Sequence, residues 1–366
     1  MPLKPLIHSL TPALLALAIL SCGGGGGSKK DDPPPPAANV YVVGYERNTQ
    51  GVSVATLWVN GKSQRLGSGN YASTANSVFV FGNDVYAVGA EYISQNYYNA
   101  KLWINGNAVT LNTRDNSNSE ANSVFVANDK IYVSGRESGH SALWELNRNG
   151  TNQIFNSLEK SNSGIYSSFA SSVFVDNNDV YIAGYQYSVY DGYIPTLWAS
   201  NFGYLPQTSW GGPGWANSIF VQNGYTNVVG AKGRESTEAT IWQNDMGYGD
   251  SLSRLDSVAG SVFVKGNNTY IVGYERSNSS NDNQVATLWT KQRTTQTTRL
   301  SNGTSSARAY SVYVSGMDEF GNDKVYIAGG EYNAQGYSVA TLWINGNVQR
   351  LSSDNIHAIA LSVFVK

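Results

Sequence analysis

Five glutamates at one repeated position have the clearest potential for chemistry. Each stands two residues after the glycine of a V-V-G-type string, and Gln186 and Lys232 take this position in two further copies. Carboxylates gathered on one surface could orient a cationic or polyhydroxyl ligand, or bind calcium through oxygen atoms. Two of them at a suitable separation could also hydrolyse a glycosidic bond. The five are Glu46, Glu91, Glu137, Glu275 and Glu331.

A structural role in ion pairs is the alternative for these glutamates. Three copies carry an arginine near the end of the same repeat, where it could neutralise the carboxylate. Glu91 and Glu137 have no such arginine, and the copy with Lys232 has Arg254, so pairing explains only part of the set. The possible pairs are Glu46 with Arg65, Glu275 with Arg299, and Glu331 with Arg350.

Two tryptophans outside the repeat pattern are candidates for ligand binding. Trp210 and Trp215 lie in the string SWGGPGW, where the flanking glycines offer them few packing partners in sequence. Aromatic rings beside Asn, Ser and acidic groups can stack on sugar rings or hold an extended peptide. Packing over the ends of the scaffold is the alternative. The tyrosine candidates are Tyr45, Tyr92, Tyr187, Tyr274 and Tyr332, with Tyr97, Tyr98, Tyr185, Tyr190, Tyr193 and Tyr337 in the same class of loops.

Three short strings, each present seven times, divide residues 38–366 into repeats. An alanine stands two residues before each SVFV-type string, and leucines such as Leu66 mark a weaker fourth segment. The SVFV-type strings start at Ser77, Ser123, Ser172, Ser218, Ser261, Ser311 and Ser362. The V-V-G-type strings end at Gly44, Gly89, Gly135, Gly184, Gly230, Gly273 and Gly329. The TLW-type strings end at Trp58, Trp103, Trp144, Trp198, Trp242, Trp289 and Trp343.

These repeats predict an all-β fold, a seven-bladed β-propeller of four-stranded antiparallel blades. Pairs such as Asn60 with Gly61 are signals for tight hairpin turns. The repeat region begins with a V-V-G-type string and ends after the last SVFV-type string, so the N- and C-terminal strands are expected to share one blade and close the ring. An open β-solenoid is the alternative, but it leaves the matched ends unexplained. Each repeat tryptophan is expected to pack between neighbouring blades.

The antiparallel order of the strands also sorts the connections between them. The short turns fall on one face of the ring, whereas the second-to-third strand links and the links between blades fall on the other. Variable polar loops on a rigid scaffold are the usual place for function. The aromatic and acidic candidates belong to this second face.

The repeats resemble those of bacterial extracellular proteins that are named for an HAFLW string. The matching residues are an A-x-L-W motif at Ala55 to Trp58, Asn60 with Gly61, and the glycine string that ends at Gly44. The histidine and phenylalanine of HAFLW are replaced here. The resemblance implies a secreted, propeller-like protein and no particular chemistry.

Residues 1–21 are expected to be a lipoprotein signal peptide and not part of the fold. A single lysine precedes an apolar run from Leu10 to Leu20 that is too short to span a bilayer as a stable helix. Ile19, Leu20 and Ser21 stand before Cys22, the only cysteine of the chain. This string resembles a bacterial lipobox, which implies that Cys22 carries lipid and joins the protein to a membrane; a buried free thiol is the alternative.

Residues 22–37 are expected to form a flexible tether. They consist mainly of glycine, charged residues and proline, a composition that cannot bury enough apolar surface to offset its ordering entropy. The charges from Lys29 to Asp32 resemble the export signal of surface lipoproteins in Bacteroidetes-type bacteria; incidental linker charge is the alternative. The expected location is the outer membrane, with the lipid-anchored domain at the cell surface.

Signals for catalysis, metals, cofactors and nucleic acid are missing from the sequence. The S-x-D-x-G-x-T-W boxes of sialidase-like propellers do not occur, and His140 and His357 do not suggest a catalytic triad. Zinc would lack ligands, because the one cysteine lies in the lipobox. The net charge is −2 and the only basic run is Lys29 with Lys30, so nucleic acid is not an expected partner.

The sequence therefore favours a non-catalytic binding module, with a glycan as the expected ligand and a monomeric domain. A protein-interaction scaffold of an outer-membrane complex is the first alternative, and a glycan-cleaving enzyme is the second.

Overall fold

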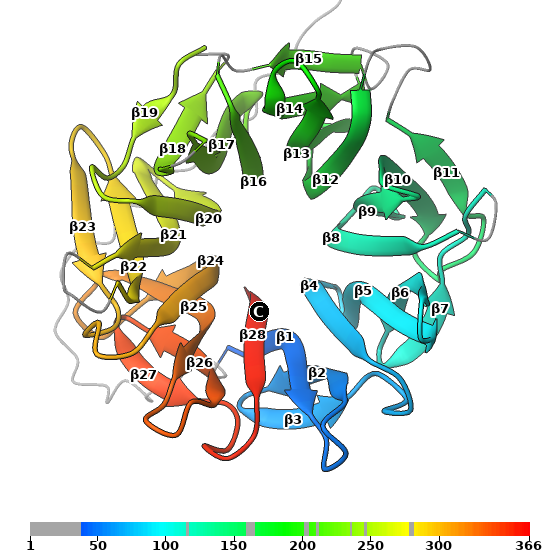
Figure 1. The fold of residues 1–366 in the computed structure, drawn as a ribbon, viewed down its shortest axis with the longest axis horizontal. Coiled ribbons are helices and arrows are strands. Elements are labelled where there is room, and N and C mark those ends of the chain that lie inside the picture. The colour runs from blue at the N-terminus through cyan, green and yellow to red at the C-terminus, as the bar shows by residue number, and fades with distance from the viewer. Residues whose placement is uncertain are drawn as a thin grey trace, which may run out of the picture. The chain divides into compact units, whose positions relative to one another are not determined.

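The computed structural model confirms an all-β propeller of seven four-stranded antiparallel blades (Figure 1). It describes residues 38–114, 117–158, 165–200, 205–209, 212–234, 236–244, 247–277 and 282–366. The predicted signal peptide, Cys22 and the tether lie outside the described residues, as does Trp210.

All blades have the same strand order from the central channel outward, and each repeat segment supplies one strand. The innermost strands are β4 (Ser73–Phe81), β8 (Ser119–Ala127), β12 (Ile165–Asp176), β16 (Gly214–Gln222), β20 (Ser257–Lys265), β24 (Ala307–Met317) and β28 (Ala358–Val365). The second strands are β1 (Val40–Arg47), β5 (Asp84–Ser94), β9 (Lys130–Glu137), β13 (Asp179–Ser188), β17 (Tyr225–Lys232), β21 (Asn268–Arg276) and β25 (Asp323–Tyr332). The third strands are β2 (Ser53–Val59), β6 (Tyr97–Ile104), β10 (His140–Asn147), β14 (Gly192–Ala199), β18 (Glu238–Gln243), β22 (Gln284–Lys291) and β26 (Ser338–Ile344). The outer strands are β3 (Lys62–Arg65), β7 (Asn107–Thr110), β11 (Ile154–Ser157), β15 (Leu205–Ser209), β19 (Asp250–Ser251), β23 (Thr295–Arg299) and β27 (Asn347–Arg350).

One blade contains strands from both ends of the described chain, as predicted. β28 pairs with β1 in antiparallel register, from Val40 opposite Val365 to Glu46 opposite Ala358. Beyond this ladder, Asn39 and Lys366 exchange backbone hydrogen bonds of 2.6 and 2.9 Å. The other blades have a hairpin turn at this place. The two chain ends therefore close the ring by hydrogen bonds between strands distant in sequence.

Serine hydroxyls tie the innermost strands of neighbouring blades to one another. The Oγ of each repeat serine accepts a hydrogen bond of 3.2–3.3 Å from a backbone N–H in the next blade. Because every blade both donates and accepts, these bonds form a closed circle around the channel. The acceptor and donor pairs are Ser77 and Val124, Ser123 and Val173, Ser172 and Ile219, Ser218 and Val262, Ser261 and Val312, Ser311 and Val363, and Ser362 and Val78.

A ring of aromatic side chains follows two residues further along the same strands. Each aromatic ring contacts the corresponding ring in both neighbouring blades, with centroids 4.7–5.0 Å apart. Tilted contacts at this distance are favourable because the edge of one ring meets the face of the next. The members are Phe79, Phe125, Phe174, Phe220, Phe263, Tyr313 and Phe364.

The repeat tryptophans form the core between blades, as predicted. All seven are at most 1% exposed. Trp343 of β26, for example, packs with Val272 of β21 and Ala286 of β22 in the preceding blade. Trp58 of β2 packs in the same way against Ala328 of β25, across the seam that closes the ring.

The repeat glycines stand opposite a bulge in the innermost strand. We number the blades in chain order, with the blade that contains β1 as the first. In the sixth blade, which contains β20 and β21, the register shifts between Ala259 and Ser261, and the carbonyl of Val258 points at Gly273. A Cβ at Gly273 would lie 1.9 Å from that oxygen, and the corresponding distance at the other repeat glycines is at most 2.2 Å. No other amino acid fits there without displacing the backbone.

The two faces of the ring differ in their connections, as predicted. We name the turn face after the short turns between first and second strands and between third and fourth strands. Asn60 and Gly61 form one of these turns, with φ angles of 51° and 81°, which are typical of a type I′ turn. We name the opposite side, with the other links, the loop face. Asn39 and Lys366 both lie on the turn face, because β1 begins and β28 ends there.

Candidate functional site

Aromatic side chains from four neighbouring blades meet along the inner rim of the loop face. They come from β12, β13 and β14, β16, β21, β24 and β25, and they border three cavities that share lining residues. We call this set the aromatic arc; β28, the innermost strand of the next blade around the ring, borders its last cavity through Ile359. The members are Phe169, Tyr185, Tyr193, Trp215, Tyr274, Tyr310 and Tyr332.

Two repeat positions supply most of the arc. One is the residue before the repeat alanine, at the start of the innermost strand, and the other is the residue after the repeat glycine. These positions are cross-strand partners within a blade, as Phe169 and Tyr185 show. Their rings are stacked, with centroids 5.4 Å apart and an angle of 9° between planes. The β-sheet therefore fixes these rings on a rigid support.

The first cavity lies between the fourth and fifth blades and has a volume of about 260 Å³. Tyr193 contacts Tyr185 edge to face, at 5.4 Å between centroids, on one wall. Trp215 is half-buried at the start of β16 and forms another wall. Ser171 and Asn217 add a hydroxyl and an amide to the lining. The cavity thus combines ring faces with hydrogen-bonding groups.

The second cavity continues from the other side of Trp215 and has a volume of about 390 Å³. Asn217 also lines both cavities, so the two are contiguous. Tyr274, Tyr310 and Arg308 form the far side of the second cavity.

The third cavity, of about 430 Å³, shares Arg308 and Tyr310 with the second. Tyr332 and Gln284 are among its other lining residues. Burial raises the pKa of Tyr310, although the neighbouring Arg308 guanidinium acts in the opposite direction. Tyr310 is therefore a neutral hydroxyl at neutral pH and can both donate and accept hydrogen bonds.

The predicted aromatic candidates divide between the arc and its surroundings. Trp215, Tyr274 and Tyr332 line the cavities. Tyr187 lies beside the arc, with its ring 5.1 Å from that of Tyr193. Tyr45 lies near Tyr310 and Tyr332, which line the third cavity, and burial raises its pKa.

Tyr92 is separate from the arc. It belongs to β5 in the second blade and packs on Tyr98, with ring centroids 5.1 Å apart.

The structure does not bring the five glutamates together. Each lies on the second strand of a different blade, and several bind groups of their own surroundings. Glu91 accepts a hydrogen bond of 3.1 Å from the backbone N–H of Ser68 and lies 3.6 Å from Lys101. Glu137 is 7% exposed and accepts a hydrogen bond from the backbone N–H of Arg114. These two carboxylates fasten the links that enter their blades.

The predicted ion pairs between the remaining glutamates and arginines are present in part. Glu331 lies 2.6 Å from Arg350, as the ion-pair alternative proposes. Burial raises the pKa of Glu46, against the opposing effects of Trp58 and Arg65. Glu275 is 5% exposed.

The sequence interpretation did not select three residues of this region: Phe169, Arg308 and Tyr310. All three flank a repeat alanine, at positions where other copies carry residues such as Thr74 or Asn76. These residues differ from those at the same position in other copies, and this difference could have identified them. The prediction considered only residues in the loops between strands, whereas these three lie near the start of innermost strands.

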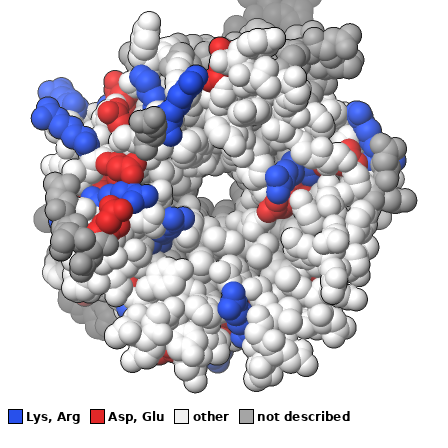
Figure 2. Space-filling view, viewed as in Figure 1, with Lys and Arg blue, Asp and Glu red and all other residues white. Residues whose placement is uncertain are grey.

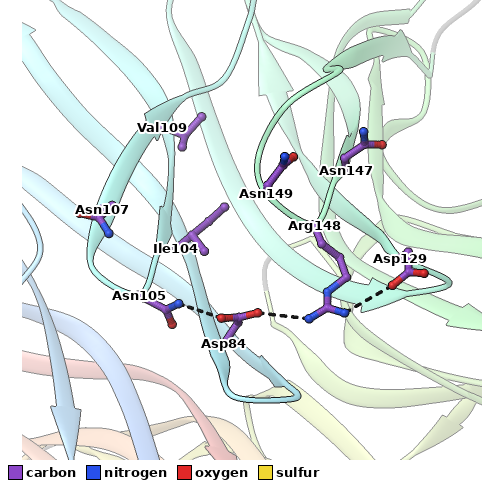
Figure 3. A pocket seen from close by; sticks show the side chains of 9 residues that line it. All are labelled: Asp84, Ile104, Asn105, Asn107, Val109, Asp129, Asn147, Arg148 and Asn149. Atoms are coloured by element: carbon purple, nitrogen blue, oxygen red, sulfur yellow. Dashed lines mark hydrogen bonds and ion pairs between the residues drawn. The ribbon is translucent and has the colours of Figure 1, made fainter.

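A rival hollow lies on the turn face between the second and third blades (Figure 3). Arg148 occupies its centre, 3.1 Å from Asp84 and 3.4 Å from Asp129. Asn105 and Arg148 hold the pKa of Asp84 below its usual range. The guanidinium also lies over the ring of Phe81, 4.9 Å from its centroid. Because these charges already pair with one another, the aromatic arc is the better candidate site.

A cluster of possible metal ligands and a membrane-spanning helix are both absent from the described residues. They contain no group of three or more His, Cys, Asp or Glu placed to hold a metal ion. None of their helices is long and apolar enough to cross a membrane. Figure 2 shows one face of the ring, with an open central channel and charged side chains that are scattered between larger uncharged areas.

The chain is similar to solved structures at low sequence identity. The β-propeller domain of the Trilobed protease from Pyrococcus furiosus is 12% identical with a TM-score of 0.51, over 89% of this chain and 95% of that chain. That domain has an open velcro topology, whereas β28 and β1 are paired here. The computationally designed Ika8 protein is 14% identical with a TM-score of 0.44, over 88% and 89% of the two chains. No family model and no curated protein matches the sequence.

Proposed function

We propose that this propeller is a non-catalytic glycan-binding module and that the aromatic arc is its binding surface. The observation that carries the proposal is the run of three contiguous cavities, in which aromatic rings alternate with side-chain amides and hydroxyls. Sugar rings present apolar faces that stack on aromatic rings and hydroxyls that need hydrogen-bonding partners. A series of such cavities matches a ligand made of successive sugar units.

The acidic residues of the site support binding without cleavage. Glycoside hydrolysis by the common mechanism needs two carboxyl groups on either side of the scissile bond. Among the described residues that line the three cavities, Asp282 is the single carboxylate, and it pairs with Arg276.

The N-terminal sequence supports the proposed location. We place the protein at the outer membrane, anchored through lipid on Cys22, with residues 22–37 as the tether. The resemblance to HAFLW-type repeats of bacterial extracellular proteins agrees with this location, since the A-x-L-W, N-G and V-V-G motifs recur around the ring.

A glycan-array screen of residues 38–366 tests the proposed function, since these residues form one compact unit. The Trp215→Ala variant is expected to bind about tenfold or more weakly, because central aromatic contacts commonly contribute over 1 kcal/mol to binding. Tyr225→Ala is the control. Tyr225 is 47% exposed and begins β17 on the turn face, away from the arc.

Two results would contradict the proposal. One is a folded domain that binds no glycan, and the other is binding that Trp215→Ala leaves unchanged. Crosslinking on intact cells would then test the alternative, a scaffold for outer-membrane proteins.

A further inference from the structure

Arg308 lies where the second and third cavities adjoin, and its guanidinium has no carboxylate partner among the described residues. Its side chain is exposed and stacks over the ring of Tyr274, with 4.8 Å between the guanidinium carbon and the ring centroid. Its Nε donates a hydrogen bond of 2.5 Å to Oε1 of Gln284. Among the described residues, no carboxylate oxygen lies within 4.0 Å of its nitrogens. The guanidinium is thus held in place without a counter-ion.

Arg136, on the same rim of the third blade, shows the arrangement with its counter-ion present. Its guanidinium also lies over an aromatic ring of a neighbouring blade, 5.3 Å from the centroid of Phe169. Glu120, its cross-strand partner, pairs with it at 3.1 Å. The cross-strand partner of Arg308 is Gly330, which has no side chain. Gly330 takes the second-strand position that Arg136 has in its own blade, so the cross-strand position beside Arg308 holds no side chain that could neutralise it and leaves room for a ligand.

The charge and shape of the second cavity favour an anionic sugar. Arg308 is the one charged residue among the described residues of its lining, and the indole of Trp215 forms another wall. Asp282 lines the neighbouring third cavity, and its carboxylate is neutralised there by an ion pair with Arg276. Asn217 donates its side-chain N–H to the carbonyl of Ala259 at 2.8 Å, so its oxygen is left for sugar hydroxyls.

We infer that the second cavity binds a sugar unit with a carboxylate, a uronic acid, within the glycan that the arc holds. The sugar ring stacks on Trp215, and its carboxylate receives hydrogen bonds from Arg308. Gln284 occupies the Nε of Arg308 and the Tyr310 hydroxyl is a further hydrogen-bonding partner of the guanidinium, so the remaining terminal N–H groups are the donors for the ligand. Planar guanidinium and carboxylate groups match in geometry, and charge-assisted hydrogen bonds between them are strong. This inference rests on the proposed glycan-binding function and narrows its ligand.

Polyuronates and their carboxyl-reduced forms test the inference. Reduction turns each uronic acid into its neutral sugar and keeps the linkages, so the pair differs in charge alone. Polygalacturonate and alginate fragments are suitable probes, measured by calorimetry on the purified domain of residues 38–366. At least one polyuronate is expected to bind about tenfold more tightly than its reduced form.

Two variants test whether Arg308 causes the preference for a polyuronate over its reduced form. Arg308→Gln is expected to remove the tenfold preference while weak binding of the reduced glycan persists. Arg136→Gln removes a stacked arginine that lines none of the three cavities, and is expected to keep the preference.

The outcomes separate this inference from the proposed function. Equal binding of acidic and reduced glycans, lost in Trp215→Ala, would overturn the uronic acid and keep the glycan-binding function. Binding of neither form of any glycan would overturn both. Equal affinity for dextran sulfate, or tighter binding of an acidic peptide than of any polyuronate, would also overturn the uronic acid assignment.

Discussion

At the scale of single residues, the repeat glycine is the strictest requirement of the blade. The carbonyl of Val258 occupies the space beside Gly273 because the bulge at Gly260 turns the innermost strand toward it. The same contact recurs at every repeat glycine, so it is a property of the blade and not of one loop.

The Gly273→Ala variant is expected to lower the free energy of unfolding by about 1–3 kcal/mol or more, because the added methyl group overlaps a backbone oxygen. Gly247→Ala is the control, since a Cβ at Gly247 has no atom within 4 Å; its effect should stay within about 0.5 kcal/mol. Urea unfolding followed by tryptophan fluorescence measures both. Equal stability of the two variants would show that the bulge can shift at little cost.

The candidate site shows what residue patterns could predict and what they could not. Trp215 stood out because it breaks the repeat, and Tyr274 and Tyr332 stood out because the loops of that face are rich in tyrosine. Arg308 did not, since its significance depends on Gly330, a residue 22 positions away that becomes its neighbour through strand pairing. Whether a charge has a partner is decided by cross-strand and inter-blade contacts, which the linear sequence does not display.

At the scale of elements, the third strand of each blade acts through its tryptophan. Trp343 is fully buried and joins β26 to β21 and β22 of the preceding blade. The side chain thus belongs to the interface between blades as much as to its own sheet.

The Trp343→Ala variant is expected to lose about 3–5 kcal/mol of stability, because a large cavity opens between two blades. Calorimetry or chemical unfolding measures the loss. Glycan binding per folded molecule should be unchanged, since Trp343 lines none of the cavities. A thermal midpoint equal to that of the wild type would contradict the packing described here.

The strands were predictable because each repeat string forms the same strand of the blade every time it occurs. Seven copies of each string make this pattern recognisable in the sequence. The aromatic ring of the innermost strands was not predicted, although its members are printed in every SVFV-type string. The alternation of side chains along a strand predicts which residues share a face of the sheet, but it does not predict which face contacts the neighbouring blades around the channel. The contact of Phe79 with both Phe125 and Phe364 depends on the curvature of the assembled ring.

At the scale of the whole molecule, the number of blades and the closure of the ring followed from the sequence. Counting the strings gave seven blades, and the unmatched segments at the two ends implied the pairing of β28 with β1. The location of the protein is a prediction of the N-terminal sequence and needs its own experiment.

Metabolic labelling with a fatty-acid analogue tests the proposed anchor. The wild-type chain, expressed in a Bacteroidetes-type host, is expected to take up the label and sediment with outer membranes. The Cys22→Ala variant is expected to lose the label and the membrane association while the propeller remains folded. A membrane fraction that retains the variant unchanged would contradict the lipid anchor.

Both ends of the propeller leave the ring on the turn face, next to the hydrogen bonds between Asn39 and Lys366. The aromatic arc lies on the opposite face. The point at which the chain enters the ring, at Asn39, is therefore on the face opposite the aromatic arc. In the same way, a sensor surface or a fluorescent label coupled after Lys366 would present the arc outward and leave it open to long polymers.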